Sequence, residues 1–328
     1  MGEDSGEVLN IRGLRVDFHT KRGVVRAVRG LDLSVRRAEI VGVVGETGCG
    51  KSVTALSVLR LIPRPGVISA GWVMFHNQDL LRLPEKHLRS VRGNRISMIF
   101  QEPSSSLNPV FRVADQIAEV LRFQVGLAPR VARGRAVDLM REVGIPDADV
   151  RARCYPHQLS GGMNQRIMIA MALACSPEIL IADEPVTALD ATIKGQILSL
   201  LRQLRDRHGS SIVLITHDLG IVAHTCDRVA VMYMGRVVEA APVDVLFRWP
   251  LHPYTRGLLG SLPGLHLDRS ELQVIPGSVP GPYDLPAGCS FHPRCAIAGV
   301  DCPESEPVLA DVGDGHLVAC HCDVGGLQ

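Results

Sequence analysis

The sequence predicts an α/β fold built around a parallel sheet, and three observations carry this prediction. Short β-rich runs alternate with helical stretches from about residue 8 to residue 240. Two of these runs, Glu178–Ala182 and Ile212–Thr216, are apolar almost throughout, which is typical of strands buried on both faces of a parallel sheet. A third run, Glu39–Val44, leads through a glycine-rich loop into a helix, the order of elements that phosphate-binding folds use.

The remaining elements follow from residue type and spacing. Half-buried strands are predicted at 8–18 and 31–35, a further strand at 96–100, and a hairpin at 228–239 that turns at Met234-Gly235. Apolar residues at helical spacing predict helices at 51–61, 113–123, 131–143 and 193–208, the last of which ends at Gly209.

Composition excludes several classes of protein. The chain has 328 residues, 46% hydrophobic and 21% charged, which excludes intrinsic disorder and leaves ample chain for a core. Its 35 basic and 34 acidic residues give a net charge of +1, so the basic excess of a nucleic-acid binder is missing. Neither a membrane span nor a secretory signal is recognisable, and we expect a cytosolic chain or one on the cytosolic face of a larger assembly.

Composition also predicts where the chain divides into domains. Prolines become frequent after residue 240, and the periodic pattern fades there. We therefore expect one domain over residues 1–240 and a small, loop-rich module over 241–328. A single phosphate-loop motif without internal repeats predicts one nucleotide-binding unit per chain.

The strongest motif is the loop Gly45-Glu46-Thr47-Gly48-Cys49-Gly50-Lys51-Ser52, which fits the pattern G-x-x-x-x-G-K-[ST] between strand and helix. In such a loop the glycines let backbone N–H groups turn toward a β-phosphate. Lys51 would reach the β- and γ-phosphates and the Ser52 hydroxyl would coordinate Mg²⁺. The helix that follows adds the positive end of its dipole.

A pair of carboxylates forms the second element of the predicted site. The apolar strand Ile179–Ala182 delivers Asp183 and Glu184 to its carboxyl end, where parallel sheets bind ligands. Asp183 is suited to Mg²⁺ through water, and Glu184 to orienting and activating an attacking water.

Several further motifs resemble those of the ABC ATPases. Leu159-Ser160-Gly161-Gly162-Met163 resembles their signature motif and precedes Asp183-Glu184 at the family's distance. Gln101 matches the family's Q-loop, and Ala188-Leu189-Asp190 matches its D-loop. His217 matches the switch histidine, and Phe18 matches the aromatic residue that stacks on adenine. Together the motifs cover roughly residues 8–240 in the family's order.

This resemblance implies a fold and a set of roles. The fold would be a P-loop ABC-type nucleotide-binding domain with a RecA-like core, an antiparallel β subdomain and a helical subdomain at about 104–160. Ser52, Gln101 and Asp183 would surround Mg²⁺, Glu184 would polarise the water, and His217 would contact the γ-phosphate of ATP. The signature residues Ser160, Gly161 and Gly162, with Asp190 of the D-loop, would face the ATP held by a second ATPase subunit, so the chain would work as a dimer.

Three stretches resemble the dipeptide, oligopeptide and nickel importer subfamily in particular: 99–110, 183–190, and the ending with Leu251-His252-Pro253-Tyr254-Thr255 followed by the cysteines. This implies an ATPase that energises import of di- or oligopeptides from the cytoplasmic face of the membrane. Its partners would be a second ATPase subunit, by the family's habit a paralogue, two transmembrane permease subunits and an extracytoplasmic peptide-binding protein. The coupling helices of the permeases would contact the region 104–160.

Cysteines crowd the last 40 residues. Cys289, Cys295, Cys302 and Cys320 offer four thiolates, with Cys322 as a spare, and such a set can hold a [4Fe–4S] cluster or zinc. Structural zinc sites favour C-x₂₋₄-C pairs that are missing here, and the tail resembles that of iron–sulfur-containing peptide-importer subunits, so the cluster ranks first. Zinc and reduced, unligated thiols stay open, and we expect His292 to be a bystander.

Three other interpretations of the function stay open. The same type of subunit serves importers of nickel or another small solute, and soluble ABC ATPases act on ribosomes or DNA. In a third reading the tail is a metal-sensing interaction module in which ATP only gates assembly.

Overall fold

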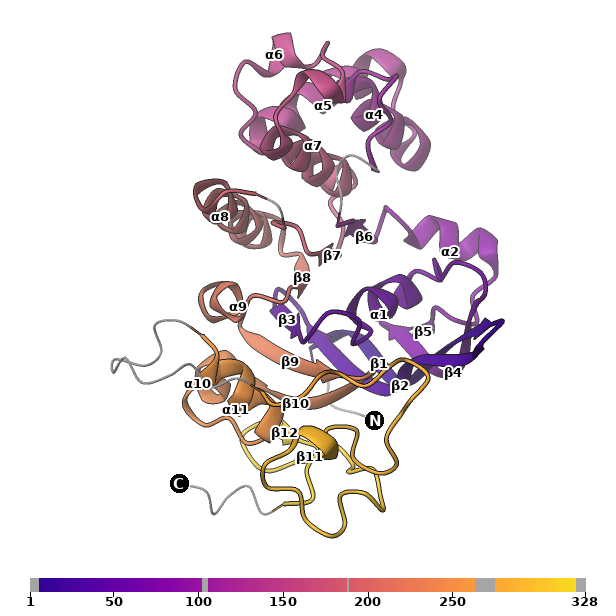
Figure 1. Ribbon diagram of the computed structural model, residues 1–328. Coiled ribbons are helices and arrows are strands. Elements are labelled where there is room, and N and C mark those ends of the chain that lie inside the picture. The colour runs from indigo at the N-terminus through magenta and orange to yellow at the C-terminus, as the bar shows by residue number, and fades with distance from the viewer. Residues whose placement is uncertain (1–5, 102–105, 188, 263–274, 323–328) are drawn as a thin grey trace. The chain divides into compact units, whose positions relative to one another are not determined.

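The protein was studied as a computed structural model that describes residues 6–101, 106–187, 189–262 and 275–322. These residues form two compact units, and each is described by itself. The first comprises the described parts of 1–35, 40–81 and 216–328, and the second comprises those of 36–39 and 82–215 (Figure 1).

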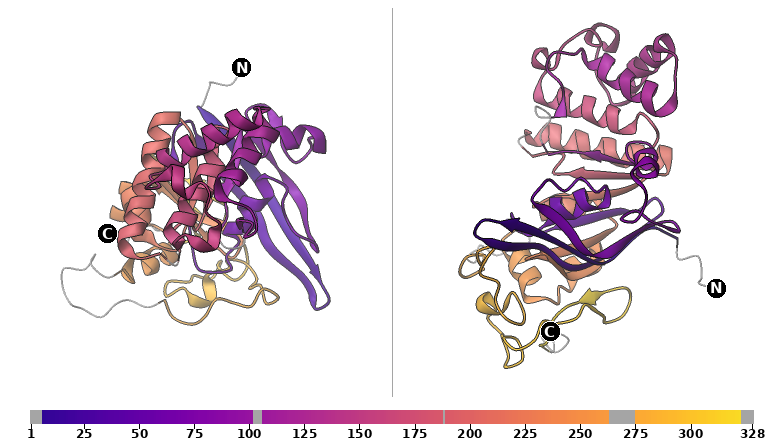
Figure 2. Two further views of the ribbon diagram at one scale, coloured as in Figure 1. Left: turned by 90° about the horizontal axis from the view of Figure 1, so that it is seen from above. Right: turned by 90° about the vertical axis from the view of Figure 1, so that its right-hand side faces the viewer.

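The first unit begins with a four-stranded sheet in the order β2-β1-β4-β5. Its strands are β1 (Glu7–Thr20), β2 (Gly23–Arg36), β4 (Gly66–Phe75) and β5 (Gln78–Asp79). β1 pairs antiparallel with β4, and β4 pairs antiparallel with β5. The long strands of this sheet twist together in the right-hand view of Figure 2.

The first unit also contains the strand that leads into the glycine-rich loop. Its strands β3 (Ile40–Val44) and β9 (Arg228–Tyr233) run parallel, while β10 (Arg236–Pro242), β12 (Leu317–Val318) and β11 (Ala310–Asp311) continue antiparallel. The helical elements of the unit are α1 (Lys51–Val58), α9 (Leu219–Thr225), α10 (Val243–Arg248), α11 (Pro253–Gly260) and the 3₁₀ turn η3 (His292–Arg294).

The second unit has three parallel strands and a group of helices. The strands β6 (Ile96–Ile99), β7 (Ile179–Asp183) and β8 (Ser211–Ile215) pair in this order. The helical elements are α2 (Glu85–Val91), α4 (Val113–Val120), the π-helical turn η1 (Leu121–Val125), α5 (Pro129–Glu142), α6 (Ala148–Arg151), the 3₁₀ turn η2 (Pro156–Gln158), α7 (Gly161–Leu173) and α8 (Ala191–His208). Helices α4, α5, α6 and α7 gather in one group in Figure 1.

Burial explains why these runs form strands and where the core sits. Every residue of β3, β7 and β8 is buried, as the apolar runs predict for strands covered on both faces. The hairpin between β9 and β10 turns at Met234 and Gly235, whose φ angles of 42° and 82° suit the tight turn that the sequence predicts. Among the described residues, no helix has the length and apolar character needed to cross a membrane.

Candidate functional site

The glycine-rich loop follows β3 directly and ends where α1 begins. Gly50 is the N-cap of α1, with φ 103°, and a Cβ at this position would lie 2.5 Å from the Ala27 carbonyl oxygen. Only glycine fits this backbone without displacing a neighbour. No side chain caps the helix, so the first N–H groups of α1 and the positive end of its dipole are oriented toward an anion at the loop.

Lys51, the first residue of α1, is held against the loop. Its side chain is buried, and its Nζ donates to the carbonyl oxygens of Gly45 at 2.8 Å and Glu46 at 3.1 Å. Cys49 Sγ lies 3.7 Å from the same Nζ. Burial raises the pKa of the Cys49 thiol although Lys51 opposes the rise, so the thiol stays protonated. Ser52 follows in the first turn of α1.

The second group of predicted residues lies at the carboxyl end of β7. Asp183 is the buried last residue of this strand, and Glu184 follows with a φ of 46°, a left-handed conformation that is uncommon outside glycine. The Glu184 carboxylate accepts hydrogen bonds from Thr187 Oγ1 at 2.8 Å and from Gln101 Nε2 at 3.3 Å. Its backbone N–H donates to the Ile215 carbonyl at 2.9 Å, which ties this corner to β8. The structure therefore brings the Q-loop residue and the candidate water-activating carboxylate together.

The signature residues open helix α7. Ser160 is the N-cap of α7, and its hydroxyl accepts the Met163 N–H at 3.4 Å. Asp190 caps α8 in the same way, accepting the Ile193 N–H at 2.9 Å. A Cβ on Gly162 would lie 3.0 Å from the Ile193 side chain, so the first turns of the two helices pack against each other. The signature and the D-loop thus form one surface of the second unit, with Gly161 exposed upon it.

The other two predicted residues belong to the first unit. His217 is exposed and lies next to Asp218, which caps α9 by accepting the N–H groups of Gly220 and Ile221. Phe18 is half-buried in β1 opposite Gly66 of β4, where a Cβ would lie 2.7 Å from its ring. The predicted site residues are therefore divided between the two units: Phe18, 45–52 and His217 in the first, and Gln101, 160–162, Asp183, Glu184 and Asp190 in the second.

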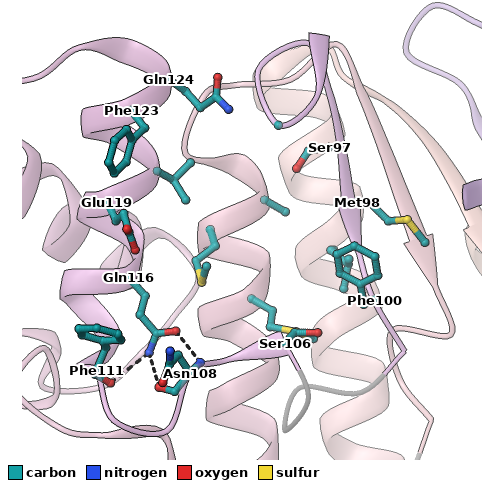
Figure 3. A pocket seen from close by; sticks show the side chains of 16 residues that line it. Ser97, Met98, Phe100, Ser106, Asn108, Phe111, Gln116, Glu119, Phe123 and Gln124 are labelled. Atoms are coloured by element: carbon teal, nitrogen blue, oxygen red, sulfur yellow. Dashed lines mark hydrogen bonds between the residues drawn. The ribbon is translucent and has the colours of Figure 1, made fainter. Parts of the chain in front are cut away.

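A hollow of about 900 Å³ opens in the second unit beside the Q-loop. Figure 3 shows aromatic side chains around it, with Phe100 at the end of β6 and Phe111 and Phe123 on the side of α4 and η1. These three rings are 41%, 54% and 78% exposed, a large apolar surface to leave in water. Buried Gln116 orders the rim, because its amide exchanges hydrogen bonds of 2.9 and 3.0 Å with the Asn108 backbone.

The predicted metal site at Cys289, Cys295, Cys302 and Cys320 finds no support. Across the parts of the chain that the structure describes, which include all four, no group of three or more His, Cys, Asp or Glu side chains is arranged to hold a metal ion. Burial raises the pKa of each of these thiols, that of Cys320 to about 12. Because the thiolate is the form that binds a metal, the protons of these thiols would have to be released on binding.

The surroundings of these cysteines give the physical reason. Cys289 and Cys295 pack against the apolar cluster that contains Tyr254 and Phe291, and an apolar environment disfavours a thiolate. The ring of His292 hydrogen-bonds through Nδ1 to the carbonyl of Cys289 at 2.8 Å. The described residues therefore give no support to the predicted iron–sulfur or zinc site.

Comparison with known proteins identifies the family. The family model "ABC transporter" matches residues 28–187, and the model "Oligopeptide/dipeptide transporter, C-terminal region" matches residues 238–302. A probable peptide ABC transporter ATP-binding protein of Sinorhizobium fredii is 50% identical over 315 residues, covering 95% of this chain and 94% of the relative. The chain belongs to the ABC transporter family, as an ATP-binding subunit of the oligopeptide/dipeptide type.

Further relatives agree with this assignment. The dipeptide transport ATP-binding protein DppD of Escherichia coli is 47% identical over 314 residues, 96% of each chain. Among solved structures, the dimeric ATP-binding cassette MJ0796 in a post-hydrolysis state with ADP and Pi matches with a TM-score of 0.65 at 25% identity, covering 72% of this chain and 98% of that one. The fold is thus the P-loop α/β fold of ABC nucleotide-binding domains, and the activity of this ABC subunit is ATP hydrolysis.

Three residues near the site are absent from the sequence-based set. Thr187 lies within the motif that carries Glu184, but only the structure shows its hydrogen bond to that carboxylate. Tyr254 and Arg294 contact Glu46 of the phosphate loop from the far end of the chain. Local spacing carries no signal for such a contact, although Tyr254 and Arg294 both belong to the stretches that mark the subfamily.

Proposed function

We propose that this ABC subunit hydrolyses ATP in composite sites between two ATPase subunits, and that the hydrolysis energises import of di- or oligopeptides. The cargo is inferred from the relatives, which are named as peptide and dipeptide transport proteins over 93–96% of this chain. Residues 238–302 also match the oligopeptide/dipeptide transporter C-terminal region, whereas the general cassette MJ0796 covers only 72% of this chain.

The chemistry of the residues supports their proposed roles. Lys51 and the N–H groups of the loop and of α1 bind the phosphates, and Phe18 stacks on the base. Ser52, Gln101 and Asp183 supply the oxygen ligands that suit Mg²⁺, which neutralises charge on the phosphates when bound.

The carboxylate of Glu184, which follows β7, is proposed to activate the attacking water. Glu184 is the residue whose placement carries the proposal: Thr187 and Gln101 orient its carboxylate at the end of a buried strand, as required of a group that polarises an attacking water. His217 contacts the γ-phosphate, and the exposed surface of Ser160–Gly162 with Asp190 is directed to the ATP of the second subunit.

The partners are inferred from the relatives, and the aromatic hollow supports a permease subunit as one of them. We infer that it receives an apolar segment of a permease subunit, because Phe100, Phe111 and Phe123 present apolar surface around an ordered rim. Phe100 precedes Gln101 in the chain, so a segment seated in the hollow pushes on the residue that orients Glu184. The subunit would then sit on the cytoplasmic face of the membrane, with two permeases, a second ATPase and an extracytoplasmic binding protein completing the importer.

The Glu184→Gln variant tests the catalytic role. This variant keeps the shape of the side chain, so it should bind ATP normally, turn it over at least about a hundredfold more slowly and accumulate as an ATP-bound dimer. Lys51→Ala is the matched control, since it should lose nucleotide binding and dimerisation together. Steady-state hydrolysis retained in Glu184→Gln would remove Glu184 from this role.

The metal and domain hypotheses have their own tests. Iron, acid-labile sulfide and zinc analysis of anaerobically prepared protein decides whether Cys289, Cys295, Cys302 and Cys320 hold a [4Fe–4S] cluster, zinc or nothing.

Limited proteolysis decides whether residues 241–328 behave as a module distinct from residues 1–240, since a module would be released as a fragment by cleavage near the boundary.

A further inference from the structure

The phosphate loop is attached to the C-terminal part of the chain by an ion pair. Arg294 donates from both terminal nitrogens to the carboxylate of Glu46, the second residue of the loop, at 2.8 and 3.2 Å. The Arg294 side chain is 6% exposed and that of Glu46 is 29% exposed. This bidentate geometry is the strong and directional form of an arginine–carboxylate contact. A single-contact ion pair on the surface contributes much less to stability.

Arg294 is itself held in a fixed position. It ends the 3₁₀ turn η3, its Nε donates to the Pro276 carbonyl at 3.1 Å, and its guanidinium lies 5.9 Å from the centre of the Tyr233 ring. The hydrogen bond to Glu46 raises the pKa of Arg294, so its guanidinium stays protonated. These contacts hold the Arg294 side chain in one position, and the ion pair with Glu46 anchors the loop to it.

Tyr254 makes a second attachment to the same loop residue. Its hydroxyl accepts the backbone N–H of Glu46 at 3.0 Å, and its side chain is fully buried. The Tyr254 ring packs against Tyr233 and Phe291, with centroids 4.7 and 5.4 Å away. Phe291 begins the turn that carries Arg294, so both attachments belong to one aromatic cluster.

The backbone carbonyl of Glu46 contacts the part of the loop that would bind phosphate. Its carbonyl oxygen accepts from Lys51 Nζ at 3.1 Å and from the Cys49 N–H at 3.2 Å. Glu46 is thus fixed on one side by Arg294 and Tyr254 and contacts Lys51 on the other. A shift of Glu46 would move the acceptor that holds the phosphate-binding lysine.

We propose that Arg294 and Tyr254 are positioning residues for ATP binding, through which the C-terminal region sets the conformation of the phosphate loop. The proposal rests on the proposed role of the loop in binding ATP. It assigns the C-terminal region of this subunit a part in nucleotide affinity, besides any part in assembly. Loss of Arg294 would also leave the Glu46 carboxylate without its cation in the loop that would bind the phosphates, which would add charge repulsion to the loss of order.

The test compares ATP affinity in matched variants of the full-length chain. Arg294→Met should weaken equilibrium binding of a fluorescent ATP analogue and raise the KM for ATP by about tenfold, with kcat within about threefold. Arg236→Met is the control, because Arg236 also forms an ion pair with the C-terminal region, to Glu306 at 2.8 Å, but does not contact Glu46. This control should leave the affinity within about twofold.

A double mutant separates positioning from general stability. If Arg294 acts through Glu46, the Arg294→Met change should have no further effect in a Glu46→Gln background. The proposal is overturned if the affinity of Arg294→Met is unchanged, if Arg236→Met weakens binding equally, or if the two changes add. Should Arg294→Met not fold, Arg294→Lys and Tyr254→Phe replace it, each with an expected loss of about three- to tenfold.

Failure of this proposal is distinguishable from failure of the proposed function. If the wild-type chain and Lys51→Ala bind the ATP analogue alike, the phosphate loop is not the ATP site and the proposed function fails. If Lys51→Ala loses binding while Arg294→Met matches the wild type, only the positioning role is wrong.

Discussion

Acid should destabilise this protein through one buried histidine. His252 is the N-cap of α11, where its Nδ1 accepts the Tyr254 N–H at 3.0 Å, and it is 1% exposed. Burial lowers the pKa of His252 to about 4 from the usual 6.5, and the nearby Glu239 carboxylate opposes this shift only in part. The imidazole therefore stays neutral in the folded chain and protonates readily in the unfolded one.

The sign and size of the effect follow from this difference in pKa. Above pH 6.5 the ring is neutral in both states and makes no pH-dependent contribution. As the pH falls from 6.5 toward 4, only the unfolded chain takes up the proton, so the free energy of unfolding falls by up to about 1.4 kcal/mol per pH unit. The loss attributable to His252 amounts to about 3 kcal/mol over this window.

Urea denaturation at pH 7, 6, 5 and 4 measures this loss. His252→Asn keeps a side-chain oxygen that can cap α11 but removes the titration, so its unfolding free energy should fall less steeply in acid than that of the wild type. His19→Asn is the control, because His19 is exposed on β1 and should leave the slope unchanged. Equal acid slopes for His252→Asn and the wild type would show that His252 is not the group whose protonation destabilises the fold.

Three further outcomes are expected. Gly50→Ala should abolish ATP binding while leaving a folded chain by circular dichroism, because the added Cβ lies 2.5 Å from the Ala27 carbonyl at a φ of 103°; normal binding would contradict the tight loop geometry. Thr187→Val should lower kcat about fivefold with an unchanged KM, since it removes a hydrogen bond worth about 1 kcal/mol to Glu184; an altered KM alone would show a binding role instead. Phe123→Glu should prevent co-purification with the permeases while the isolated subunit keeps its basal ATPase activity, as it places a charge in the aromatic hollow; intact complexes would exclude the hollow as the docking site.

Much of the fold was predictable because local rules dominate where the chain is most buried. The runs at β3, β7 and β8 are short, fully buried and apolar except for Asp183 and Ser211 at strand ends, and the hairpin at Met234-Gly235 has a turn that glycine favours. Boundaries were less predictable. The helix expected over 113–123 ends at Val120 and continues as the π-helical turn η1, which depends on packing rather than on residue type.

The site shows the same division between local and long-range information. The phosphate loop is one contiguous motif whose glycines and lysine each have a local reason to be there. The partner of Glu46 is 248 positions away, and no spacing rule connects Arg294 to it. The cysteine-based metal prediction lacked support for a related reason, because composition counts thiols but does not show how they are arranged in space, and no three potential ligands among the described residues are placed to hold a metal ion.

Peptide uptake in cells measures whether this subunit drives import. Cells whose own copy of this subunit is deleted would receive either the native chain or Lys51→Ala and be supplied with labelled di- and oligopeptides. We expect the native chain to restore ATP-dependent uptake, whereas Lys51→Ala, present in equal amount, should not. Equal uptake with both chains would contradict an ATP-driven peptide importer that depends on this subunit.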